Sequence, residues 1–104
     1  MSYQFKYDER LGISIPIIEK GWEQYSIHEQ EQILFEWEEF RSDIPSRIKE
    51  LEKIITKKQE ELSREENFAL SCKLNDEISR LASTINDLNI WFRIQQDTQA
   101  RSHH

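Results

Sequence analysis

Acidic side chains are the most abundant groups in this sequence that could do chemistry. Two carboxylates act as general acid and base only where a cleft buries them unequally and separates their pKa values. The glutamates concerned stand in charged, helix-forming stretches, which predicts a solvated helix face: Glu36, Glu38, Glu39, Glu60 and Glu61. A di-iron bundle would need Glu-x-x-His pairs, but His28 is the only histidine outside the C-terminal pair. We therefore expect no catalytic residue, no metal ligand and no cofactor.

Nucleophilic chemistry is not indicated either. No serine or cysteine has a plausible histidine partner, and the sequence lacks a glycine-rich phosphate loop. The single cysteine, Cys72, cannot form an internal disulfide, and its helical surroundings predict a small buried apolar side chain rather than a reactive thiol. The segment Arg101-Ser102-His103-His104 looks like the start of an expression tag and is excluded from metal arguments. We expect that the protein is not an enzyme.

Helices must position these groups, because the composition leaves little room for other elements. The 104-residue chain has two glycines and two prolines, with 33% charged and 37% hydrophobic residues. Such a composition favours long helices that each bury one stripe. We predict an all-α fold with one helical domain, residues 1–100, followed by the tag remnant 101–104. No stretch approaches the roughly 20 apolar residues of a membrane span, and the N-terminus lacks a signal-peptide layout. We therefore expect a cytoplasmic protein that does not enter a membrane.

The net charge of −6 is unevenly distributed along the chain. Residues 1–45 contain ten acids and four bases, whereas residues 46–104 contain ten of each. The whole negative excess therefore belongs to the N-terminal part. Nucleic-acid binding relies on clusters of lysine and arginine that release counterions from phosphates, so direct binding of nucleic acid is not expected.

The first fifteen residues are interpreted as an extended arm that docks on the helices. Tyr3, Phe5 and Tyr7 alternate with polar residues, as in a short strand, but no second strand is visible to pair with them. Pro16 is interpreted as part of the first turn of a helix. A short amphipathic turn or two would follow from Ile17, Ile18, Trp22 and Tyr25.

A helix of about residues 27–42 is predicted next. Ser26 and Glu29 match a capping box, which satisfies two backbone N–H groups at a helix start. Apolar residues then recur at helical spacing: Ile33, Trp37, Phe40 and Ile44. Pro45 marks either a kink or the first turn of a new helix with Ser42 or Asp43 as its cap.

The second half of the chain predicts a long antiparallel helical hairpin, with arms of about residues 44–63 and 67–97. Each arm has mostly apolar residues at spacings of three and four, the seam pattern of packed helices: Ile48, Leu51, Ile55, Lys58 and Leu62, then Ser71, Leu74, Ile78, Leu81, Ile85, Leu88 and Phe92. The two series are out of phase, so one straight helix cannot bury both on one face. We expect a reversal between Ser63 and Asn67, with Asn67 capping the second arm. One continuous helix of about fifty residues is the alternative, since the turn lacks glycine.

The segment Asn67–Leu81 reads NFALSCKLNDEISRL. An aromatic residue follows the predicted turn, two small residues come three and four positions later, and leucine, aspartate and isoleucine continue along the helix. These residues are Phe68, Ser71, Cys72, Leu74, Asp76 and Ile78, with Leu81 one turn further. The pattern resembles the UVR motif, a short helical hairpin of the B and C subunits of the bacterial excinuclease and of some protease-regulatory adaptors. The resemblance covers about residues 47–82 and implies a hairpin that binds other proteins.

The run Phe35-Glu36-Trp37-Glu38-Glu39-Phe40 is the most distinctive local feature. In one interpretation Trp37 and Phe40 are core and the glutamates are a solvated face. In the other, an acidic helix with exposed aromatics docks on a basic protein surface, because charge steers the encounter and an aromatic anchors it. The candidate partner-binding residues are Glu31, Phe35, Glu38 and Glu39, with Glu65 and Phe68 at the turn.

A small regulatory or adaptor protein that binds another protein is the function this sequence favours. A self-associating hairpin, with a four-helix-bundle dimer, is the structural alternative. We expect a homodimer, because Ile54, Leu70, Ala82 and Ile90 flank the seam and need covering. An accessory role in a DNA-repair complex is the third hypothesis, and it depends on the UVR resemblance alone.

Overall fold

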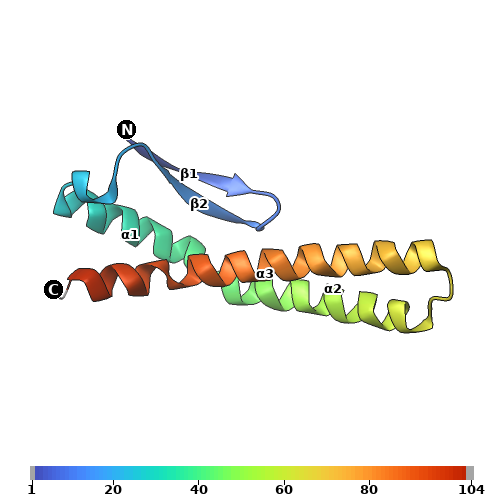
Figure 1. Cartoon of the computed structure of the whole chain (residues 1–104). Helices are drawn as coiled ribbons and strands as arrows, with labels where there is room; N and C mark the ends of the chain where they lie inside the picture. Colours follow the sequence, from blue (N-terminus) through green and yellow to red (C-terminus); the bar gives the residue numbers. More distant parts are fainter. Residues whose placement is uncertain (1, 103–104) are drawn as a thin grey trace.

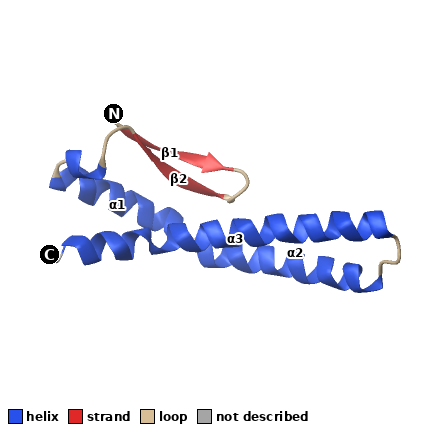
Figure 2. Ribbon diagram, in the orientation of Figure 1, coloured by secondary structure: helices blue, strands red, loops and turns tan. Residues whose placement is uncertain are grey.

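The protein is mostly helical, with a short β-hairpin at its N-terminus (Figures 1 and 2). The computed structural model describes the backbone of residues 2–102 and the side chains of residues 2–94. In chain order the elements are β1 (Tyr3–Asp8), β2 (Ile13–Ile18), the 3-10 helix η1 (Trp22–Gln24), α1 (Ile27–Arg41), α2 (Ile44–Arg64) and α3 (Phe68–Ser102). Residues 103–104 of the predicted tag remnant lie outside the described residues.

The predicted helical hairpin is confirmed. Helices α2 and α3 lie antiparallel along the long axis of the molecule and are joined by the three residues 65–67 (Figure 1). The Asn67 Oδ1 atom accepts a hydrogen bond from the Leu70 backbone N at 3.1 Å, so Asn67 caps α3 as expected. The Glu65 carboxylate accepts from the Asn67 backbone N at 3.0 Å and closes the turn without a glycine. The continuous-helix alternative is therefore wrong.

Pro45 starts a new helix rather than kinking an existing one. It occupies the first turn of α2, where its missing N–H has no intrahelical acceptor in any case. Asp43 is the N-cap of α2, but its side chain makes no capping hydrogen bond. Helices α1 and α2 therefore meet at a bend around residues 42–43 (Figure 1).

The predicted capping box opens α1 as expected. The Ser26 hydroxyl accepts from the Glu29 backbone N at 3.1 Å, and the Glu29 carboxylate accepts from the Ser26 backbone N at 3.0 Å. The bond that the Glu29 carboxylate accepts from the Ser26 backbone N favours its ionised form and is the main cause that lowers the pKa of Glu29 from its ordinary value. The Ser26 side chain lowers this pKa further.

The extended arm and the all-α class are corrected by the β-hairpin. Strands β1 and β2 pair antiparallel, with Tyr3 opposite Ile18 and Asp8 opposite Ile13. The run Ile13–Ile18 is rich in β-branched residues, which favour a strand. The interpretation of Pro16 as a helical first turn is therefore wrong, as is the helical assignment of Ile17 and Ile18.

Proline is tolerated in β2 because of its position in the ladder. The Glu19 backbone N donates to the Ser2 carbonyl, so Ser2 and Glu19 form a hydrogen-bonded pair. Such pairs alternate with non-hydrogen-bonded pairs along an antiparallel ladder, and in β1 they therefore fall at the even-numbered residues. Pro16 pairs with Phe5, so its nitrogen faces away from β1 and no ladder bond is lost.

Residues 9–12 join the two strands in a tight connection. The Asp8 carboxylate accepts from the Leu11 N at 2.9 Å, and the Asp8 carbonyl accepts from the Gly12 N at 2.7 Å. Gly12 has a φ of 75°, which only glycine adopts at little cost. The connection then places Leu11 and Ile13 in the core.

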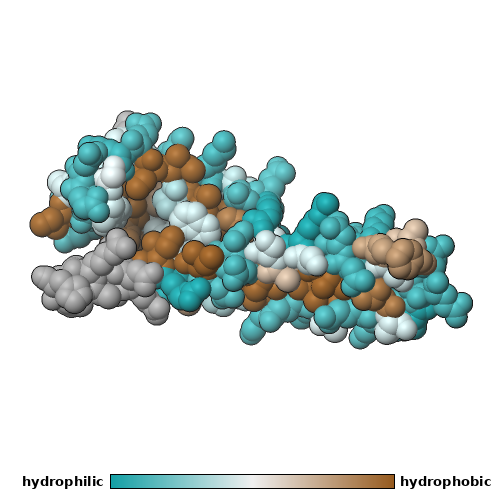
Figure 3. Space-filling view, in the orientation of Figure 1, coloured by the Kyte–Doolittle hydropathy of each residue, from teal (hydrophilic) through white to brown (hydrophobic). Residues whose placement is uncertain are grey.

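The core lies where the β-hairpin meets the aromatic ends of the helices. Its buried cluster consists of Leu11, Ile13, Trp37, Ile44, Leu51 and Leu88. Phe40, Trp91 and Phe92 pack against this cluster, and the Trp37 and Trp91 ring centroids lie 5.6 Å apart. Figure 3 shows hydrophobic surface continuing between the β-hairpin and the helices.

Candidate functional site

The outward side of α1 carries four of the predicted partner-binding residues. We call Glu31, Phe35, Glu38 and Glu39 the acidic face. Successive helical residues are rotated by about 100°, so Phe35 points about 160° away from Ile33 and Trp37. Those two residues are only 2% and 1% exposed, whereas Phe35 is 71% exposed.

Three glutamates surround Phe35 on this helix surface. Glu31, Glu38 and Glu39 all lie within about 60° of Phe35 around the helix axis, and all three are exposed. Ile27, one turn before Glu31, is 74% exposed and adds a second apolar side chain to the same side of α1. The four residues of the acidic face therefore lie together on the outward side of α1.

The charge of Glu38 is partly balanced by a neighbouring arginine. Its carboxylate lies 3.2 Å from the Arg41 guanidinium, whose side chain is only 14% exposed. Arg41 is fixed by a hydrogen bond from its Nε to the Phe92 carbonyl at 2.7 Å, with its guanidinium 4.2 Å from the Phe92 ring centroid. Within the described part of the chain, Glu31 and Glu39 form no ion pair. These two glutamates therefore carry the uncompensated charge of the acidic face.

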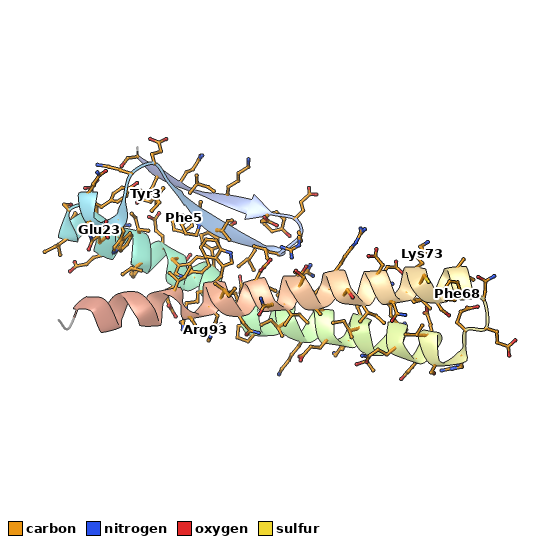
Figure 4. The ribbon with its side chains drawn as sticks, in the orientation of Figure 1. Tyr3, Phe5, Glu23, Phe68, Lys73 and Arg93 are labelled. Carbon is orange, nitrogen blue, oxygen red and sulfur yellow. The ribbon has the colours of Figure 1, made fainter. Side chains whose placement is uncertain are left out.

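Glu36 faces the β-hairpin instead of solvent. The Tyr3 hydroxyl donates a hydrogen bond of 2.6 Å to the Glu36 carboxylate. This bond raises the pKa of Tyr3, because the carboxylate stabilises the protonated phenol; partial burial and the negative charges nearby act in the same direction. Figure 4 shows Tyr3 and Phe5 between β1 and α1. Glu36 is therefore part of the contact between these elements.

The aromatic residues of the acidic-aromatic run are divided between the core and the surface. Trp37 is buried, and Phe40 is partly buried with its ring centroid 5.1 Å from that of Phe5, so these two are core residues. Phe35 remains as the exposed aromatic of the run.

Glu65 and Phe68 lie at the other end of the molecule. Phe68 is 83% exposed at the start of α3, where Figure 4 labels it beside the turn. Glu65 is partly buried and its carboxylate closes the turn, which gives this residue a structural role. The molecule is 58 Å long, and α1 lies at the opposite end from the turn (Figure 1). The six predicted residues therefore form two separate sites.

Cys72 corrects another prediction, because its side chain is exposed rather than buried. It faces away from the seam that Leu74 and Ile78 line.

His28 is also exposed, in the first turn of α1. Across the described residues, no three histidine, cysteine, aspartate or glutamate side chains come together as metal ligands would. No helix in the same part of the chain is long and apolar enough to span a bilayer.

Two hollows were not predicted from the sequence. One, of about 280 Å³, is apolar and lies between β2, α1 and α3, with all three tryptophans, Trp22, Trp37 and Trp91, in its wall. The other, of about 330 Å³, is lined by Arg10, Arg47 and Arg80. These arginines lie more than thirty residues apart in sequence, so a search for local charge clusters passes over them.

The fold and the acidic face define a helical-hairpin protein with an N-terminal β-hairpin and an exposed acidic helix. Comparison with protein-family models, curated proteins and solved structures gives no match to this chain. The resemblance to the UVR motif therefore stays a prediction.

Proposed function

We propose that the protein is a cytoplasmic adaptor or regulatory protein that binds a partner with a basic surface through the acidic face of α1. The observation that supports this proposal most is the 71% exposure of Phe35 among Glu31, Glu38 and Glu39. An exposed aromatic side chain within a charged rim is the usual composition of an interaction hot spot.

The acidic face contributes little to the stability of the fold, which favours a role in binding. Like charges at helical spacing cost a few tenths of a kcal/mol per pair, and an exposed Phe35 buries little apolar area. The inner side of the same helix is fixed in the core through Ile33 and Trp37. The helix therefore presents the acidic face in one orientation, which reduces the entropy lost on binding.

Charge reversal on the acidic face is expected to slow association with the partner. Once wild-type protein has been used to isolate that partner, Glu31→Lys with Glu39→Lys should lower the association rate constant about tenfold at low salt. Binding by this variant should also depend less on ionic strength. Surface plasmon resonance over a series of salt concentrations measures both quantities. Glu38 stays unchanged in this test because its replacement would also disturb Arg41.

The matched control is Glu60→Lys with Glu61→Lys, which makes the same charge change at exposed positions of α2. If the control slows association as much as the α1 variant, net charge alone steers the encounter and the acidic face is not the binding surface. Phe35→Ala should increase the dissociation rate, since truncating an anchor acts mainly on that step. An unchanged dissociation rate would exclude Phe35 as the anchor.

Self-association is the second candidate function. Ile54, Leu70 and Ile90 are 41%, 48% and 49% exposed, so each has apolar surface that a dimer could cover. Leu70 and Ile90 point about 160° apart around α3, however, because twenty residues separate them. A bundle interface would therefore cover only some of these residues.

Accessory action in DNA repair remains the third hypothesis and still depends on the UVR resemblance.

Sedimentation velocity at micromolar concentration tests the homodimer directly. A dimer would sediment with twice the 12.6 kDa mass of the chain, and Ile90→Glu or Leu70→Glu should then shift it toward monomer according to which side of α3 is covered. A single monomeric species at every concentration would remove the structural candidate and leave binding to a different protein.

A further inference from the structure

Three arginines from three separate elements meet at one hollow near the middle of the molecule. Arg10 belongs to the connection between β1 and β2, Arg47 to α2 and Arg80 to α3. They line a volume of about 330 Å³ together with Leu51, Leu81, Ser83 and Thr84, and no carboxylate belongs to this lining. We call this volume the arginine hollow. In a chain of net charge −6 such a wall is unexpected.

Arg47 is held in place by the backbone of the hairpin connection. Its Nε donates to the Leu11 carbonyl at 3.0 Å, and a terminal nitrogen donates to the Arg10 carbonyl at 3.4 Å. Gly12 leaves the space that this guanidinium fills, because a side chain at position 12 would collide with it. Arg47 is thus a preorganised member of the wall, with its side chain 25% exposed.

Arg10 is oriented by α3. One terminal nitrogen lies 2.8 Å from the Asp87 carboxylate, and the other donates to the Ser83 hydroxyl at 3.3 Å. The Ser83 hydroxyl oxygen accepts this hydrogen bond from Arg10, so its O–H group remains available to donate to another acceptor. Arg10 and Ser83 therefore form a second polar part of the wall, next to Arg47.

Arg80 is the arginine with unused donors. Its Nε pairs with Asp76 at 3.0 Å, but its two terminal nitrogens make no hydrogen bond within the described part of the chain. Its side chain is 80% exposed. Two adjacent terminal nitrogens of a guanidinium form a planar fork that matches two oxygens of a phosphate or carboxylate.

We propose that the arginine hollow binds a phosphate monoester. The phosphate oxygens would accept from the terminal nitrogens of Arg80 and from the preorganised guanidinium groups of Arg10 and Arg47. The volume equals about eleven times that of a liquid water molecule, which exceeds what one phosphate group needs. The apolar side chains of Leu51 and Leu81 would contact the small organic group of the ester.

The carboxylates outside the hollow set the expected strength of binding. Asp87, Glu50 and Asp76 each pair with one of the three arginines, so the empty site is nearly neutral overall. A dianion therefore gains from short charge-assisted hydrogen bonds more than from long-range attraction. Weak, saturable binding that survives physiological salt is the expected behaviour. This inference is independent of the function proposed for the acidic face.

The test is a nuclear magnetic resonance titration of the whole protein at constant ionic strength, with inorganic phosphate and phenyl phosphate as probes. The backbone amides of residues 10–12 and 80–84 should shift and saturate, and phenyl phosphate should bind more tightly because its ring contacts the leucines. Arg80→Ala should weaken binding of both probes about tenfold, the loss expected for a charge-assisted hydrogen-bonding partner. Arg80→Lys should recover only part of this loss, because lysine keeps the charge without the planar fork.

Arg64→Ala is the matched control, since it removes one exposed positive charge at the far end of α2. Binding by this variant should equal that of the wild-type protein. The proposal is overturned if Arg64→Ala and Arg80→Ala weaken binding equally, or if sodium chloride at matched ionic strength shifts the same amides as far as phosphate does. Because Arg80 is exposed, its variants should keep the wild-type circular dichroism spectrum and melting temperature, which verifies that any loss of binding is local.

Discussion

Replacing Trp37 by alanine is expected to lower the free energy of unfolding by about 3–5 kcal/mol. Trp37 is 1% exposed and belongs to the buried cluster between the β-hairpin and the helices. Its ring contacts that of Trp91, with the centroids 5.6 Å apart. Alanine would leave a large cavity that the surrounding helices can close only in part, and a loss of this size is a large fraction of the stability of a small domain.

Urea unfolding followed by far-ultraviolet circular dichroism measures this loss. Phe35→Ala is the matched control, because it removes an aromatic side chain from the same helix at a position that is 71% exposed. The control should change the free energy of unfolding by less than about 0.5 kcal/mol. Similar losses in both variants would contradict the orientation of α1 on which the acidic face depends.

Phenylalanine at position 37 should recover much of the stability. The Trp37 Nε1 is buried and has no hydrogen-bond partner within the described residues, and an unsatisfied buried donor costs about 1–3 kcal/mol. Trp37→Phe removes this donor while keeping an aromatic ring. The gain offsets part of the volume lost, so this variant should be closer to wild type than Trp37→Ala.

The helical hairpin could be predicted because its signals are local and repetitive. The phase break between the apolar series of the two arms favoured a reversal over one continuous helix, and Asn67 supplied the cap that fixes where α3 begins. The capping box of Ser26 and Glu29 likewise fixed the start of α1. Each of these signals requires only residues within a few turns of helix.

The β-hairpin could not be predicted because its identity depends on pairing between distant residues. Pro16 suggested a helix start, and only the register with Phe5 shows that its nitrogen points away from the ladder. The exposure of Cys72 was missed for a different reason, since a small residue beside the seam carries no strong sign of direction. The arginine hollow needs three elements to assemble before Arg10, Arg47 and Arg80 become neighbours.

The acidic face was only partly predictable from the sequence. The sequence named Glu31, Phe35, Glu38 and Glu39 as candidates, and all four are exposed on the outward side of α1. The pairing of Glu38 with Arg41 depends on the position of Phe92, fifty-one residues further along the chain from Arg41. The function of this face remains a proposal whose test is the charge reversal at Glu31 and Glu39.

Gly12→Ala should be the most destabilising change to a solvent-accessible residue, with a loss of about 2–4 kcal/mol in the free energy of unfolding. Two effects add to this loss. The φ of 75° places residue 12 in the left-handed region, which costs a residue with a Cβ atom about 1–2 kcal/mol. The new Cβ would also collide with the Arg47 guanidinium and weaken its bond to the Leu11 carbonyl.

Gly21→Ala is the control that the chain provides. Gly21 has φ −58° and ψ 147°, which any residue adopts, and a Cβ there would meet only a Glu23 carboxylate oxygen at 3.4 Å. This variant should be neutral or more stable by about 0.4–1 kcal/mol, because alanine restricts the unfolded chain. Thermal unfolding of both variants under one buffer condition gives the comparison, and equal effects would contradict the left-handed conformation at Gly12.

A double-mutant cycle with Arg47→Ala separates the two causes. If the collision with Arg47 contributes, Gly12→Ala should cost less in the Arg47→Ala background than in the wild-type protein, because the obstructing guanidinium is absent. The cost that remains is then that of the left-handed backbone alone, about 1–2 kcal/mol. Additive losses would mean that the Arg47 side chain moves aside freely. Arg47 would then not be fixed in the wall of the arginine hollow, and phosphate binding would have to depend on Arg10 and Arg80.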